Sequence, residues 1–114
     1  MTDSFADLLA ANRTYAAEEF THGGFDGIAH AGVAVVTCMD SRIDPLGLLG
    51  LHAGDAKILR NAGARVTDDV LRTLVLAVYL LGVDRVLVMP HTDCRMAKST
   101  DEEQRMVSKR RADG

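Results

Sequence analysis

Three short hydrophobic runs along the chain predict β-strands, at residues 33–37, 56–60 and 83–89. The first run is apolar and rich in β-branched residues, which is typical of a strand buried on both faces of a parallel sheet. Residues 4–20 and 68–81 instead place apolar side chains at helical spacing, so they predict helices. Apolar residues cover so much of the circumference of the 68–81 helix that we expect it to be heavily buried.

Polar residues, glycines and a proline mark where these elements begin and end. Ser4 is a candidate N-cap for the first helix, and Thr67 or Asp68 for the helix that Gly82 then stops. A glycine-rich loop covers residues 21–32, a short helix is expected at 46–51 after Asp44-Pro45, and residues 100–103 match a capping box that opens a last helix to about 111. The alternation of strands and helices predicts an α/β fold. We expect a parallel-centred sheet with the strand order 2-1-3 and onward, flanked by helices.

Composition narrows the class of protein. The 114 residues are enough for one domain, 1–114. Because no strand follows the last predicted helix, we expect either that a C-terminal segment of that domain is lacking or not shown, or that a second subunit supplies the missing sheet area. A net charge of −3 argues against a nucleic-acid partner. The longest apolar stretch, 74–83, is too short to cross a membrane, and the N-terminus lacks the features of a signal peptide, so we expect a cytoplasmic protein.

The candidate chemistry lies at the ends of two predicted strands. Cys38 and Cys94 are the only cysteines, and in a reducing compartment they are more readily metal ligands than a structural disulfide. Cys38 follows the first strand, and His91-x-x-Cys94 follows the third. Two thiolates and one imidazole form a three-ligand zinc set with a fourth position open, as in catalytic zinc sites. In a 2-1-3 sheet the two strand ends are neighbours, and Asp40 and Arg42 reach the same cavity.

Together these motifs resemble the β-class carbonic anhydrases from about Val33 to Cys94. The matching segments are Cys38-Met39-Asp40-Ser41-Arg42, Gly54-Asp55, Arg60-Asn61-Ala62-Gly63, Val66-Thr67-Asp68-Asp69 and His91-Thr92-Asp93-Cys94. The resemblance implies one Zn²⁺ per chain on Cys38, His91 and Cys94, and a catalytic dyad of Asp40 and Arg42. It also implies reversible hydration of CO₂ to bicarbonate and a proton by a zinc-bound hydroxide, in a homodimer or higher homo-oligomer.

An apolar wall beside the metal would hold CO₂. We assign the substrate pocket to Ala62, Gly63, Val66 and Leu87, and expect Gly63 to need a positive φ or a close backbone approach. Asp40 has two plausible states: paired with Arg42, it leaves the metal open to water, whereas on the metal it is a fourth ligand that closes the site. Arg60 and Asp55 are expected to buttress the structure, and His22, His30 and His52 to be solvated surface residues.

Two alternatives stay open. The same site suits a hydrolase of COS or CS₂, because only the route to the metal would select the substrate. A non-catalytic zinc-binding homologue would have Asp40 permanently on the metal, or a pocket filled by Arg95, which stands where the family often has glycine.

Overall fold

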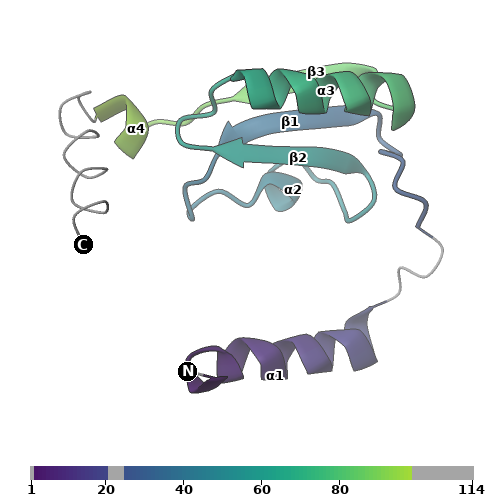
Figure 1. Cartoon of the computed structure of the whole chain (residues 1–114), viewed down its shortest axis with the longest axis vertical. Coiled ribbons are helices and arrows are strands. Elements are labelled where there is room, and N and C mark those ends of the chain that lie inside the picture. The colour runs from purple at the N-terminus through teal and green to yellow at the C-terminus, as the bar shows by residue number, and fades with distance from the viewer. Residues whose placement is uncertain (1, 21–24, 99–114) are drawn as a thin grey trace.

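The computed structural model of the chain describes residues 2–20 and 25–98, and its centre is a three-stranded parallel sheet in the order β2-β1-β3 (Figure 1). The strands are β1 (Val33–Cys38), β2 (Ala56–Asn61) and β3 (Arg85–Met89). Val33 pairs with Ala56 on one side and Arg85 on the other. Every residue of β1 is buried, as expected for a β-branched run at the centre of a sheet. The predicted strand order and the α/β class are therefore confirmed.

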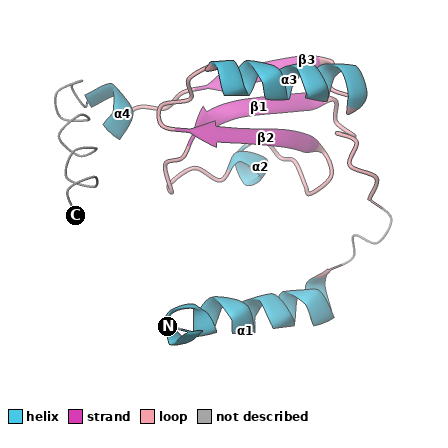
Figure 2. Ribbon diagram, viewed as in Figure 1, coloured by secondary structure: helices cyan, strands magenta, loops and turns pink. Residues whose placement is uncertain are grey.

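The helix α3 (Asp68–Leu80) covers one face of this sheet (Figure 2). Thr67 is its N-cap, and the Thr67 hydroxyl accepts a hydrogen bond from the Val70 amide at 3.3 Å. A small core of Ala29, Ala34, Ala77 and Val83, with Leu74 packed against it, joins the helix to β1. Side chains alternate faces along a strand, so Val33 points the other way. It lines a cavity there with Leu49 and Leu51, which follow the short helix α2 (Pro45–Leu48).

The prediction that residues 68–81 are heavily buried is wrong for the single chain. Val70 and Ala77 are the buried residues of α3, whereas Leu71 and Val75 are 51% and 56% exposed. The hydrophobic pattern shows only that these side chains are apolar, and it does not show what covers them. A sheet of three strands, however, covers only one side of the helix.

The N-terminal helix lies apart from the sheet (Figure 1). A 3-10 turn (η1, Thr2–Phe5) leads into α1 (Ala6–Thr14), and a π-helical turn (η2, Tyr15–Glu19) continues it. The predicted Ser4 cap is wrong, because Ser4 lies inside the 3-10 turn and Phe5 is the N-cap residue of α1. The apolar face predicted for this helix is exposed, as Leu8 and Leu9 illustrate.

The C-terminal part begins with α4 (Arg95–Lys98), directly after Cys94. The helix predicted at 100–111 lies outside the described residues, as does His22. Among the helices that the structure describes, none is long and apolar enough to span a membrane.

Candidate metal centre

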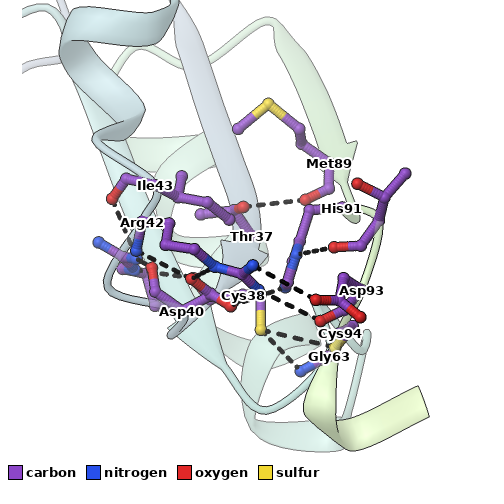
Figure 3. Close-up of polar contacts among 12 residues, drawn as sticks. Thr37, Cys38, Asp40, Arg42, Ile43, Gly63, Met89, His91, Asp93 and Cys94 are labelled. Carbon is purple, nitrogen blue, oxygen red and sulfur yellow. Dashed lines mark hydrogen bonds and ion pairs between the residues drawn. The ribbon is translucent and has the colours of Figure 1, made fainter. Parts of the chain in front are cut away.

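The carboxyl ends of β1 and β3 bring the predicted ligands together (Figure 3). Cys38 is the last residue of β1, and His91 follows β3 after a single proline. The ligand atoms of Cys38, His91 and Cys94 all lie within 4.8 Å of one another, with the two sulfurs 3.8 Å apart. Both cysteines are buried and free of a disulfide. Residues separated by more than fifty positions therefore converge because parallel strands end at one edge of the sheet.

The side chain of His91 is arranged as a metal ligand would be. Its Nδ1 lies 2.7 Å from the Thr92 carbonyl oxygen, which can only accept a hydrogen bond, so Nδ1 is the protonated nitrogen. The other nitrogen, Nε2, is buried and makes no hydrogen bond to any described residue. A buried nitrogen with a lone pair, beside two sulfurs, fits a zinc ion. The two cysteine sulfurs and the imidazole nitrogen therefore form a donor set that suits zinc.

A turn after β2 stabilises the thiolate of Cys38. The Gly63 amide donates a hydrogen bond to Cys38 Sγ at 3.4 Å, and this bond is the main cause that lowers the pKa of Cys38 to about 7. Asn61 shapes the turn, because its side chain bonds both the amide and the carbonyl of Arg65. Gly63 has φ +91°, as the sequence predicted. The pKa of His91 is raised, chiefly by the neighbouring Cys38 sulfur.

Asp40 is paired with Arg42, and one of its carboxylate oxygens faces His91. Its Oδ1 accepts hydrogen bonds from the Arg42 amide at 2.8 Å and from Nε at 2.9 Å, and its Oδ2 accepts one from Nη2 at 2.7 Å. These bonds to the guanidinium hold the pKa of Asp40 well below its usual range, so the carboxylate is ionised at neutral pH. Oδ2 lies 3.7 Å from His91 Nε2. The structure therefore has the first of the two predicted arrangements.

Arg60 supports the backbone that carries these groups. From β2, its Nε donates to the Cys38 carbonyl at 2.9 Å, and its Nη2 donates to the Asp40 carbonyl at 2.8 Å and to the Ile43 carbonyl at 3.3 Å. The predicted buttressing role of Arg60 is confirmed. The sequence did not indicate which backbone it supports.

The four residues assigned to the substrate pocket lie in two places. Ala62 and Gly63 form the turn beside Cys38, and Val66 follows it and is exposed. Leu87 pairs with Val35 in the middle of β3 and lines a cavity of about 370 Å³ with Leu49 and Leu51. The structure brings Gly63 to the cysteine and places Leu87 in that other cavity. Their role towards CO₂ stays a prediction.

The histidines outside the centre are exposed where the structure describes them. His30 pairs with Asp26 at 2.9 Å, and the side chain of His52 is 90% exposed. The sequence indicated no role for Thr92, whose carbonyl orients His91, or for Asp93. Asp93 contacts Arg42, and its position inside the His91–Cys94 segment was the only signal for it.

Comparison with known proteins places this site in a family. A sequence model described as carbonic anhydrase matches residues 33–112. β-Carbonic anhydrase 1 of Mycobacterium tuberculosis is 41% identical over 101 residues, which are 85% of this chain and 58% of that protein. A carbon disulfide hydrolase of Acidianus is 45% identical over 69 residues, which are 60% of this chain and 34% of that protein. The structure of a carbonic anhydrase from Glaciozyma antarctica superposes with a TM-score of 0.85 at 40% identity, over 97% of this chain and 65% of that one. The chain thus spans less than two thirds of the length of these relatives.

Proposed function

This chain belongs to the β-class carbonic anhydrase family, and we propose that it catalyses the reversible hydration of CO₂ to bicarbonate and a proton. The observation that carries the proposal is the convergence of Cys38, His91 and Cys94, whose ligand atoms lie within 4.8 Å of one another. The buried, unbonded Nε2 of His91 supports a metal ion at their centre. We assign one zinc ion per chain to these three residues. When bound, zinc supplies a Lewis acid that activates water at neutral pH.

The residues around the ligands have distinct proposed roles. Gly63 and the turn around it favour the thiolate form of Cys38 that binds metal, through the hydrogen bond from the Gly63 amide. His91 is oriented by the Thr92 carbonyl, so that Nε2 faces the two sulfurs. Asp40 stays ionised because Arg42 binds it. Its carboxylate, beside His91, can accept a hydrogen bond from the reacting water and so orient it.

The open arrangement supports an enzyme over a closed zinc-binding homologue. Both carboxylate oxygens of Asp40 are occupied by Arg42, which opposes its use as a fourth ligand. Arg95, the residue that departs from the family pattern, is exposed on α4. Because Arg95 is exposed, we infer that its side chain points to solvent and does not fill the pocket.

Hydrolysis of CS₂ is the second candidate, because relatives named carbon disulfide hydrolase match this chain at up to 45% identity. The two candidate functions would use the same metal centre and differ only in their substrate. Stopped-flow CO₂ hydration and sulfide release from CS₂ should be measured on the same zinc-loaded sample. Rapid CO₂ hydration without sulfide release supports the first function, and the reverse result supports the second. Full zinc occupancy with neither activity would refute both.

We further propose a cytoplasmic homodimer or higher homo-oligomer. The exposed apolar side chains of α1 and α3 give each chain two surfaces that a second copy would cover. They include Phe5, Leu8 and Leu9 on the first helical segment and Val75, Leu76, Tyr79 and Leu80 on α3. Replacing Leu8 by Glu should shift the mass measured by light scattering towards the monomer. The matched change Ala10→Glu, on the opposite side of the helix from Leu8, should shift it less.

A further inference from the structure

Arg42 is held from two sides, and Asp40 provides only one of them (Figure 3). On the other side, Nη2 donates a hydrogen bond to the Asp93 carbonyl at 3.2 Å, and Nη1 lies 3.5 Å from Asp93 Oδ2. Asp93 therefore presents both a backbone and a side-chain acceptor to one guanidinium. It connects the segment after β3 to the segment after β1.

The backbone conformation of Asp93 is unusual for a residue with a side chain. Its φ is +59°, in the left-handed region that asparagine and aspartate tolerate better than most residues. Asp93 is also the residue before Cys94. The same turn thus positions a metal ligand and the two acceptors for Arg42.

The contacts share individual atoms in a way that matters for Asp40. Arg42 Nη2 donates a hydrogen bond to the Asp93 carbonyl, and the same atom also donates one to Asp40 Oδ2 at 2.7 Å. That same Oδ2 is the oxygen 3.7 Å from His91 Nε2. A guanidinium that leaves this position would release the carboxylate oxygen nearest the metal ligands.

We propose that Asp93 is a positioning residue: it holds the Arg42 guanidinium so that Asp40 remains paired with Arg42 and away from the metal position. This inference rests on the proposed function for its consequence in catalysis. Its structural part concerns only Asp93, Arg42 and Asp40. The effect should be modest, because the side chains of Arg42 and Asp93 are 61% and 58% exposed and water competes for both.

Two variants remove the side-chain contact with Arg42 while the backbone conformation of residue 93 is kept. Asp93→Asn keeps a residue that tolerates the left-handed backbone and removes the negative charge. Asp93→Gly keeps the backbone conformation and removes the side chain altogether. Asp7→Asn makes the same charge change in the exposed first turn of α1 and is the matched control.

The test measures the exchange of the Arg42 Nε proton with water, by NMR on the zinc-loaded protein, together with kcat/KM and zinc content. We expect both Asp93 variants to speed this exchange about two- to fivefold and to lower kcat/KM by a similar factor. Zinc should stay at one per chain, and Asp7→Asn should change nothing. An unchanged exchange rate would overturn the proposal, as would loss of zinc, which would show that Asp93 serves the ligand turn instead. If the unmodified protein does not hydrate CO₂, the proposed function fails, whereas the exchange rate still decides whether Asp93 holds Arg42.

Discussion

Replacing Gly63 by alanine should disturb both the fold and the metal centre. At φ +91° an L-residue costs about 1–2 kcal/mol. A Cβ built there would lie 2.9 Å from Met96 Cγ and 3.1 Å from Met96 Cβ. These atoms are close to the backbone of α4, so α4 must shift, at an overpacking cost of about 1–3 kcal/mol. The total loss of unfolding free energy is about 2–5 kcal/mol, the sum of these two ranges.

The shift of α4 should also move Cys94, which directly precedes it, relative to Cys38. We therefore expect zinc affinity to fall about tenfold or more, since about 1.4 kcal/mol of the packing cost suffices for that factor. Urea unfolding of the metal-free, reduced protein gives the first quantity, and competition with a chelator gives the second.

Gly50→Ala is the matched control for this experiment. Gly50 also has a positive φ, of +70°, but an added Cβ would meet no atom within 4 Å. It should therefore lose only the backbone part, about 1–2 kcal/mol, and keep its zinc affinity. Equal losses of stability in the two variants, with unchanged zinc binding in both, would refute the contact between Gly63 and α4.

Three further predictions concern the groups around the metal. In metal-free protein, alkylation of Cys38 by iodoacetamide should rise with a midpoint near pH 7, because the thiolate forms above the lowered pKa of about 7. A midpoint at the ordinary thiol value would contradict this. The pKa of Asp40 is lower in the folded than in the unfolded chain, so its pairing stabilises the fold above about pH 4 and that stability is lost as pH falls. Asp40→Asn should accordingly flatten the decline in urea midpoint between pH 5 and pH 3, and an unchanged slope would refute the pairing. Arg60→Gln should weaken zinc binding about tenfold through the three carbonyls that it frees, whereas the exposed Arg72→Gln should not.

The sheet and the ligand set could be predicted because their signals are local. The β-branched run at 33–37 predicts a central strand, and the positions of Cys38 and His91 after two such runs place them at one edge. The positive φ of Gly63 could also be predicted, since a turn that closely approaches another segment favours glycine.

Features that depend on side-chain reach could not be predicted. Nothing in the sequence indicates that Arg60 spans to the carbonyls of Cys38 and Asp40, or that Asp93 adopts φ +59° beside Arg42. The exposure of α3 was missed for another reason. Periodicity reports which side chains are apolar, and the neighbours that are present decide which of them are covered.

The most direct test of the account is the coordination of zinc, because the proposed function depends on it. X-ray absorption on zinc-loaded protein should show two sulfurs at ~2.3 Å and lighter ligands at ~2.0–2.1 Å. Cys38→Ser should lose one sulfur and most of the bound metal. Full zinc occupancy in Cys38→Ser, or fewer than two sulfurs in the unmodified protein, would contradict a centre built from Cys38, His91 and Cys94.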